Sequence, residues 1–258
     1  MNIEDYMEFM HELFDSSIPR LGPGSDHSTK QALDVLFSAN PKLKDIELRI
    51  LDIGCGNGSQ TLELAKHVDG SILAVDNHQP YLDELQRRAE SEGVSGKIQT
   101  FLRDMCDMGL PGGSFDLIWS EGALYNMGFR EGLETCHSLL VPGGFLAASE
   151  LAWFRSDTPA ECSQYFANEY PAMVDIDTNI SLINNAGYKV VDHFNLPESA
   201  WWESFYNPLE VRIKALRKKY ASDPQQLEMI NSVDMEIDMY RKYSSYYGYA
   251  FFLMQQSN

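Results

Sequence analysis

The sequence predicts an α/β fold built on a doubly wound, mainly parallel sheet. Residues 50–62 read Ile-Leu-Asp-Ile-Gly-Cys-Gly-Asn-Gly-Ser-Gln-Thr-Leu, which is typical of a buried strand, a glycine-rich turn and the start of a helix. Between residues 47 and 151, strand-like apolar runs alternate with helical patterns, and such alternation favours right-handed crossovers between parallel strands. With 258 residues and 44% hydrophobic content, the chain is long enough for one large α/β domain.

The first 44 residues are expected to form a helical arm. Apolar residues at helical spacing predict a helix over residues 3–18. Ser25 or Asp26 can N-cap a second helix that continues to about Ala39. The two helices are joined by the loop 22–25, Gly-Pro-Gly-Ser, which fits a simple turn and fits equally a backbone that approaches a ligand.

Seven strands and several helices are expected after the arm. The predicted strands are residues 47–53, 71–76, 97–102, 115–120, 144–151, 188–195 and 247–254, and the predicted helices are 58–68, 79–92, 129–140 and 175–186. Residues between the last two strands are mostly helical and aromatic, and an insertion of that length is too long for a hairpin. We therefore divide a single domain, 1–258, into an arm (1–44), a core (45–196), a helical insertion (197–245) and a last strand (246–258).

The glycine turn has the spacing of a ligand-binding turn. Gly54, Gly56 and Gly58 alternate, so no Cβ blocks a molecule that lies against the backbone. A dinucleotide fingerprint, G-x-G-x-x-G, would require glycine at the position of Ser59. Asp52 would repel a pyrophosphate but suits an ammonium group. The turn therefore favours a nucleotide-like ligand other than a dinucleotide.

Acidic residues follow the second and third predicted strands. Asp76 ends an apolar strand 18 residues beyond Gly58, where a carboxylate can accept hydrogen bonds from ribose hydroxyls, and Asn77 follows it. Asp104 and Met105 come after the third strand. A solvated strand-end carboxylate is the alternative for Asp76, and a plain turn residue is the alternative for Asp104.

The three segments 52–58, 73–77 and 100–105 together resemble the motifs of class I S-adenosylmethionine (SAM)-dependent methyltransferases. The resemblance covers residues 45–196 and implies a seven-stranded, Rossmann-like sheet with an antiparallel last strand and a lid formed by the helical insertion. It also implies that the glycine turn lies against the methionine and ribose of SAM, with an acid facing the amino end. The residues it assigns to the cofactor are Asp52, Gly54, Cys55, Gly56, Gly58, Asp76 and Asn77 (ribose), Asp104 and Met105 (adenine), and Glu121.

Two carboxylates are candidates for contact with the substrate or for a general base. Glu121 ends the fourth predicted strand, within a run that matches the family's pattern, and Glu150 lies near the end of the fifth. Open α/β sheets place ligand chemistry at such ends. A carboxylate there can equally bond backbone or cap a helix. The candidates for the substrate pocket are Tyr125, Asn126, Trp153 and Tyr246, for which ordinary core packing is the alternative.

Composition limits the partners and the compartment. A net charge of −18 disfavours a general nucleic-acid surface. The four cysteines are dispersed, without the spacing of a disulfide framework or a metal site. We expect no membrane segment, because no apolar run approaches spanning length, and we expect a cytoplasmic protein. The oligomeric state is open, with a homodimer as one option.

The expected function is methyl transfer from SAM to a small-molecule acceptor, through nitrogen, oxygen or carbon. No Asn-Pro-Pro-Tyr-like segment follows the fourth strand, which disfavours the amino-methylating DNA enzymes. Two alternatives remain open. One is a SAM-binding sensor without catalysis. The other is a NAD(P)-dependent oxidoreductase, which Ser59 disfavours.

Overall fold

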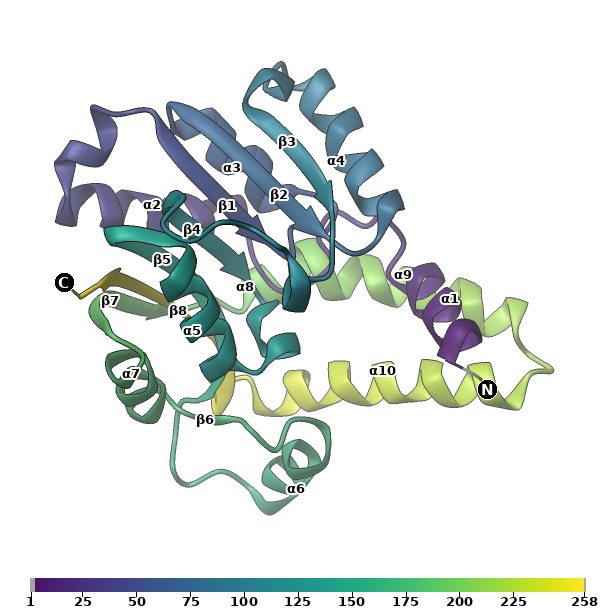
Figure 1. Cartoon of the computed structure of the whole chain (residues 1–258). Helices are drawn as coiled ribbons and strands as arrows, with labels where there is room; N and C mark the ends of the chain where they lie inside the picture. Colours follow the sequence, from purple (N-terminus) through teal and green to yellow (C-terminus); the bar gives the residue numbers. More distant parts are fainter. Residues whose placement is uncertain (1–2, 258) are drawn as a thin grey trace.

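The computed structural model describes residues 3–257, and within them eight strands form one mixed sheet in the order β3-β2-β1-β4-β5-β8-β7, with β6 paired to β5 (Figure 1). The strands are β1 (Leu48–Ile53), β2 (Gly70–Asp76), β3 (Ile98–Leu102), β4 (Phe115–Glu121), β5 (Leu140–Trp153), β6 (Val174–Asp175), β7 (Tyr188–Asn195) and β8 (Tyr247–Gln256). β8 runs antiparallel to β5 and β7, whereas the pairs among β1 to β5 are parallel. This confirms the doubly wound sheet and the antiparallel last strand.

Helices cover both faces of the sheet. They are α1 (Ile3–Leu13), α2 (Asp26–Ala39), α3 (Ser59–His67), α4 (Gln79–Ser91), α5 (Phe129–Leu139), α6 (Ala160–Glu169), α7 (Ile176–Asn185), α8 (Ser199–Trp201), α9 (Asn207–Lys219) and α10 (Pro224–Tyr243), with a π-helical segment at Trp202–Tyr206 and short 3-10 helices at Pro41–Lys44, Ser95–Lys97, Met105–Asp107 and Leu124–Met127. Apolar clusters join the sheet to α2, α3 and α4 on one face and to α5 and α7 on the other. Within residues 3–257, no helix combines the length and the apolar character that a membrane span requires.

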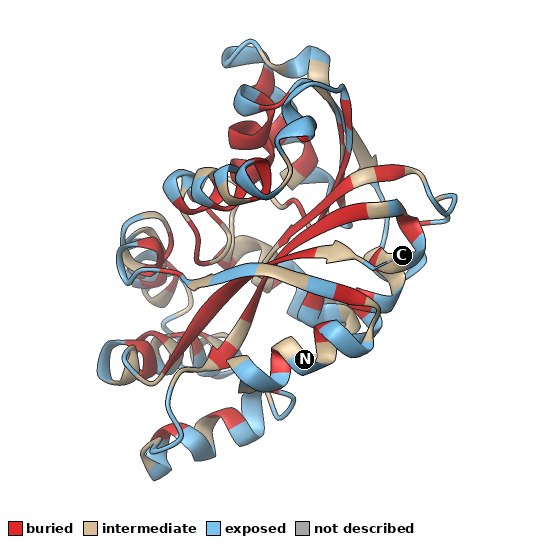
Figure 2. Ribbon diagram, turned by 90° about the vertical axis from the view of Figure 1, so that its left-hand side faces the viewer, coloured by how far each residue is buried: buried red, intermediate tan, exposed pale blue. Residues whose placement is uncertain are grey.

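The central strands are buried on both faces. In β1, Leu48 and Ile50 pack into the cluster with α2 and α3, while Leu51 and Ile53 pack into the cluster with α5 and α7. Figure 2 shows buried residues concentrated along the strands and exposed residues on the outer sides of the helices. Because neither face meets water, these strands appear in the sequence as continuous apolar runs rather than as an alternating pattern.

Most predicted elements are confirmed, with three differences. The sheet has eight strands rather than seven, because the two-residue β6 is too short to leave a sequence pattern. Helix α6 was not predicted. The first helix ends at Leu13 rather than at residue 18, since the carboxylate of Asp15 accepts hydrogen bonds from the backbone and hydroxyl of Ser17 and forms a turn that competes with the helix.

The arm and the helical insertion meet beyond the carboxyl ends of the strands. In Figure 1, α1, α9 and α10 lie together on that side of the sheet. Phe9 of α1 stacks edge-on against Tyr220 with 5.6 Å between ring centroids. Arg212 of α9 pairs with Asp15 at 3.5 Å. The arm and the helical insertion, which stand on opposite sides of the core in the sequence, therefore cover the same end of the molecule.

Gly58 offers a test of the glycine turn. It caps α3 with a φ of +85°, and an added Cβ would lie 2.1 Å from Cδ1 of Leu85. We expect Gly58→Ala to lower the free energy of unfolding by about 2–4 kcal/mol, from left-handed strain plus overpacking. Gly93→Ala is the matched control, because Gly93 has a φ of +71° and no atom near its Cβ position, so it should lose only about 1–2 kcal/mol. Urea unfolding of both variants measures the difference, and equal losses would contradict the packing role.

Candidate active site

A cavity of about 550 Å³ lies at the carboxyl ends of β1, β2, β3 and β4. It is positioned where the strand order reverses between β1 and β4, the place at which open α/β sheets bind ligands. The core contributes Gly54, Cys55, Gly56, Asn57, Gln60, Asp76, Asn77, Tyr81, Asp104, Met105, Cys106, Glu121, Gly122, Ala123, Tyr125 and Asn126, and the arm contributes Met10, His11, Phe14, Arg20, Leu21, Gly22 and Pro23. We call this the donor cavity.

The donor cavity brings together most residues that the sequence assigned to the cofactor. The turn residues Gly54, Cys55 and Gly56, the residues after β2 and β3, and Glu121 all line it. The structure does not bring Asp52 or Gly58 to it. Gly58 instead packs against Leu85.

Asp52 lies behind the wall of the donor cavity, and not on its surface as the sequence analysis expected. Its side chain is fully buried, and its carboxylate accepts hydrogen bonds from Oγ1 of Thr61 at 2.5 Å and Nε2 of Gln60 at 3.4 Å. Burial raises the pKa of Asp52 to about 7. Gln60, which also donates to the carbonyl of Cys55, lines the cavity in its place.

Asp76 is held by the backbone of the turns on either side of it. Oδ2 accepts a hydrogen bond from the amide of Gly56 at 2.9 Å, and Oδ1 accepts one from the amide of His78 at 3.0 Å. Each carboxylate oxygen can accept a further hydrogen bond from a ligand. Burial raises the pKa of Asp76, against the effect of these amides. His11 of the arm stacks on His78 with 3.4 Å between ring centroids, and burial lowers the pKa of both imidazoles.

Asp104 is the most accessible acid of the cavity. Its Oδ1 accepts a hydrogen bond from the amide of Cys106 at 2.8 Å and so caps the short helix at Met105–Asp107. The residue is exposed, which leaves the carboxylate available to a donor on a ligand. This is the position that the resemblance assigns to the adenine amino group.

Glu121 is bound by three side chains rather than free. Its Oε2 accepts from Nη1 of Arg20 at 3.0 Å, and its Oε1 accepts from Oγ1 of Thr29 at 2.6 Å and Nε1 of Trp119 at 2.9 Å. The side chains of Arg20 and Glu121 are 6% and 4% exposed. With both oxygens occupied, Glu121 is better placed to orient Arg20 than to remove a proton from a substrate.

Arg20 is the main cavity residue that sequence analysis missed. It is the only lysine or arginine that lines the donor cavity in the described part of the chain. Its five N–H donors exceed the partners Glu121, Asp26 and Thr29 provide, so it can also bind an anionic group. One signal was available, because Arg20 is the only lysine or arginine among the first 29 residues and stands just before the Gly-Pro-Gly loop.

The arm is fastened to the glycine turn by side chains that follow the glycines. Nδ2 of Asn57 donates to the carbonyls of Ser16 and Ile18 at 3.1 and 2.5 Å, and Oγ of Ser59 donates to the carbonyl of Pro19 at 2.6 Å. Asn57 and Ser59 are both buried. These contacts hold Arg20 and residues 21–23 over the donor cavity. Within the loop, Gly22 and Pro23 line the cavity, whereas Ser25 caps α2.

A second cavity of about 320 Å³ adjoins the donor cavity, and we call it the aromatic cavity. The two share Phe14, Leu21, Gly22, Pro23, Gly122 and Tyr125. The remaining wall of the aromatic cavity consists of Leu151, Tyr165, Phe166, Glu169, Tyr170, Trp201, Phe205, Tyr206, Glu236, Tyr247 and Tyr249. Tyr125 therefore lies at the junction of the two cavities, whereas Asn126 lines only the donor cavity.

Three predicted substrate or catalytic residues lie outside both cavities. Glu150 is buried, and its Oε1 accepts a hydrogen bond at 2.6 Å from Tyr170, so it acts on the aromatic cavity through that tyrosine. Trp153 lines a separate cavity beside α6 and α7. The guanidinium carbon of Arg155 lies over the ring of Tyr246, 4.7 Å from the ring centroid. Glu150 and Trp153 lie three positions apart in β5 and so point to opposite faces of the sheet, while Tyr246 lies just before β8.

The Arg20–Glu121 pair should be important for stability. Arg20→Met leaves a buried carboxylate without its cation, and we expect the free energy of unfolding to fall by about 3–5 kcal/mol in urea unfolding. The control is Arg49→Met, because Arg49 pairs with Asp116 through a side chain that is 53% exposed, and solvent screens that pair. A loss for Arg20→Met no greater than for Arg49→Met would show that the buried pair is not needed.

Glu150 should make stability depend on pH. Burial raises its pKa to about 7, above the unfolded value, so the folded state keeps the proton longer and stability is lost as pH rises through about 7. Glu150→Gln removes this titration. We expect the loss of unfolding free energy between about pH 5 and pH 8 to be about 3 kcal/mol smaller in the variant than in the wild type. The matched control is Glu134→Gln on the exposed side of α5, which should leave the pH profile unchanged. If the unfolding free energy of the wild type and of Glu150→Gln changed with pH in parallel, Glu150 would not be the source of the pH dependence.

Comparisons with known proteins agree with this geometry. Residues 50–144 match the family model described as a methyltransferase domain. The sterol 24-C-methyltransferase erg-4 of Neurospora crassa is 26% identical over 59% of this chain and 42% of its own length. The 27-O-demethylrifamycin SV methyltransferase of Amycolatopsis mediterranei is 25% identical over 75% of this chain and 70% of its own. The chain thus spans less than half the length of the sterol methyltransferase that it matches.

A solved structure extends the likeness to nearly the whole chain. A SAM-dependent methyltransferase from Geobacter sulfurreducens, in complex with S-adenosyl-L-homocysteine, has a TM-score of 0.78 and 18% identity and covers 96% of this chain and 97% of its own. At that identity the likeness concerns the fold, and the matched sequence segment contains the glycine turn and the acids after β2 and β3. Residues 50–144 therefore match a methyltransferase domain, and the chain shares its fold with a SAM-dependent methyltransferase.

Proposed function

We propose that this protein transfers a methyl group from SAM to a small-molecule acceptor. The supporting observation is that the donor cavity, where the strand order reverses, contains three polar groups. They are the buried guanidinium of Arg20, the carboxylate of Asp76, which backbone amides hold, and the exposed carboxylate of Asp104. These three groups suit the carboxylate, the ribose hydroxyls and the adenine amino group of one elongated ligand. The cavity volume is in the range of small-molecule sites.

The residues of the donor cavity fit SAM as follows. Arg20 would bind the methionine carboxylate, Asp76 would accept hydrogen bonds from the ribose, and Asp104 with Met105 would contact the adenine. SAM supplies an electrophilic methyl group on a sulfonium when it is bound. The protein would contribute position and exclusion of water, because the arm lies over the cavity and is fastened to the glycine turn.

The same contacts disfavour a nicotinamide dinucleotide. In that class of enzyme the pyrophosphate lies at the N-terminus of the helix after the glycine turn. Here the carbonyl of Pro19 accepts a hydrogen bond from Ser59, the first residue of α3, so a backbone oxygen covers that place. Ser59 also accepts from Arg88 at 3.0 Å. A pyrophosphate would have to displace the arm.

The compartment is a further proposal. Cys55, Cys106, Cys136 and Cys162 all lie in the described part of the chain, and all four are free thiols. Unpaired, dispersed cysteines are usual in proteins of a reducing compartment. We therefore propose a cytoplasmic location.

Asp76 is the direct test of the cofactor. We expect Asp76→Ala to weaken SAM binding about 100-fold in titration calorimetry, since two charge-assisted hydrogen bonds to the ribose are lost. The matched control is Asp116→Ala, because Asp116 also accepts from a backbone amide, that of Arg49, but lies at the opposite end of its strand from the cavity. Unchanged affinity in Asp76→Ala would break the ribose assignment. Stabilisation of the wild type by NAD but not by SAM would overturn the proposed function.

A further inference from the structure

We propose that the methyl acceptor is an amine, bound as its cation in the aromatic cavity, with Glu236 as its counter-ion and proton acceptor. This inference rests on the proposed function and narrows the acceptor from nitrogen, oxygen or carbon to nitrogen. Three features of the cavity support it: the sign of its charge, the kind of surface around that charge, and its position next to the donor cavity.

The charge of the aromatic cavity has one sign. Glu169 and Glu236 line it, and no lysine, arginine or histidine does so in the described part of the chain. Oε1 of Glu236 accepts a hydrogen bond from the hydroxyl of Tyr206 at 2.9 Å. Burial raises the pKa of Glu236, which shows that the surroundings disfavour its charge. A carboxylate in an apolar wall costs free energy unless a cation pairs with it, so the cavity suits a cationic ligand.

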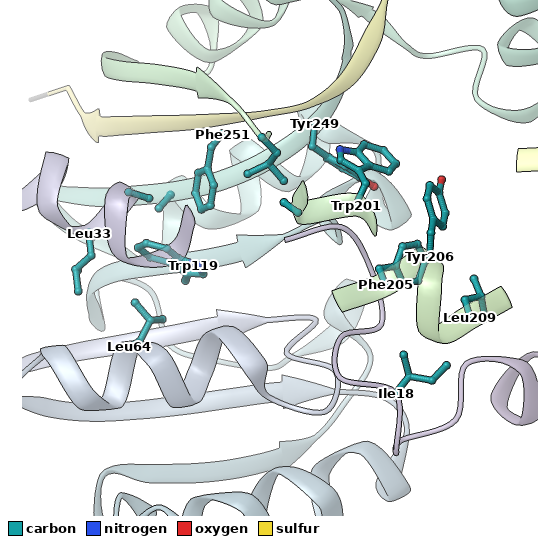
Figure 3. Close-up of a cluster of buried hydrophobic side chains, with 14 of the residues drawn as sticks. Ile18, Leu33, Leu64, Trp119, Trp201, Phe205, Tyr206, Leu209, Tyr249 and Phe251 are labelled. Atoms are coloured by element: carbon teal, nitrogen blue, oxygen red, sulfur yellow. The ribbon is translucent and has the colours of Figure 1, made fainter. Parts of the chain in front are cut away.

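The surface around these carboxylates is aromatic. Six tyrosines, three phenylalanines and one tryptophan line the cavity, and rings such as Trp201, Tyr206 and Tyr249 lie close together where the insertion meets β8 (Figure 3). Aromatic faces attract ammonium groups and exclude water at the same time. An aromatic wall alone would also suit a neutral, apolar acceptor. The carboxylates of Glu169 and Glu236 are the feature that favours a cationic ligand over a neutral one.

The position of the cavity fits an acceptor site. It shares Tyr125, Gly122 and the arm residues 21–23 with the donor cavity, so a ligand there would adjoin a ligand in the donor cavity. Glu236 lies on α10 and Tyr206 in the π-helical segment, both within the helical insertion that sequence analysis assigned to the lid. The residues that select the acceptor therefore come from outside the segment that matches the family model.

The reaction balances with these groups. The ammonium R-NH3⁺ gives one proton to the carboxylate of Glu236, and the freed lone pair on nitrogen forms the N–CH3 bond. The S–CH3 bond breaks, and its electron pair stays on sulfur, which becomes a neutral thioether. The product is R-NH2CH3⁺, and Glu236 later releases its proton to water. A proton acceptor is needed because a protonated amine has no lone pair for the attack.

Binding of matched cationic and neutral probes tests the inference. With S-adenosylhomocysteine bound, we expect choline to bind the wild type at least tenfold more tightly than its neutral isostere 3,3-dimethylbutan-1-ol in titration calorimetry. Glu236→Gln keeps the shape and the Tyr206 hydrogen bond and should bring the two affinities close to each other. The control is Glu228→Gln, the same change of charge on the same helix at an exposed position, which should keep the preference.

The outcomes separate this inference from the proposed function. SAM binding together with equal affinity for the two probes in the wild type would overturn the amine, whereas failure to bind SAM would overturn the function itself. A preference that survives Glu236→Gln would overturn the role of Glu236. Incubation with ¹³C-methyl SAM and a metabolite extract gives a second readout, since the carbon chemical shift identifies the bonded atom. An N-methyl product supports the inference, and an O-, C- or S-methyl product overturns it.

Discussion

The hydrogen bonds between the arm and the glycine turn are the constraint on which the site depends. Asn57 and Ser59 lie on either side of Gly58, and they donate to carbonyls of Ser16, Ile18 and Pro19. Both donors are buried, so without these carbonyls they would be unsatisfied polar groups, which would destabilise the fold. The turn thus has two roles, because Gly54 and Gly56 line the donor cavity while Asn57 and Ser59 hold the arm over it.

A chain of contacts leads from the arm to the last strand, β8. Arg20 follows Pro19 and pairs with Glu121, whose other oxygen accepts from the indole of Trp119. The ring of Trp119 packs edge-on against Phe251 of β8, with 5.5 Å between centroids. Figure 3 shows this cluster continuing toward Trp201 at the start of the helical insertion. Arm, fourth strand, last strand and insertion are therefore coupled through one buried network, although they are far apart in sequence.

The sequence predicted the parts of the site that strand ends determine. Parallel strands bring their carboxyl ends to one edge, so Asp76 and Asp104 could be placed together without knowledge of packing. Arg20 could not, because its partner is 101 residues away and only the tertiary fold brings the two together. For Trp153 and Glu150, the surroundings of each side chain depend on which helices and loops pack against each face of β5, and periodicity does not give that packing.

The distribution of charge over the two cavities has a consequence for the proposed reaction. A sulfonium in the donor cavity and an ammonium in the aromatic cavity would be neighbouring cations, and their repulsion would be strong in a site with little water. Glu236 and Glu169 offset that repulsion while the amine binds. Transfer of the proton to Glu236 then removes the charge on nitrogen before the bond forms, so the repulsion falls at the step where the reacting atoms approach. An acidic acceptor cavity beside a cationic donor thus serves binding first and attack afterwards, and a neutral acceptor would need neither carboxylate.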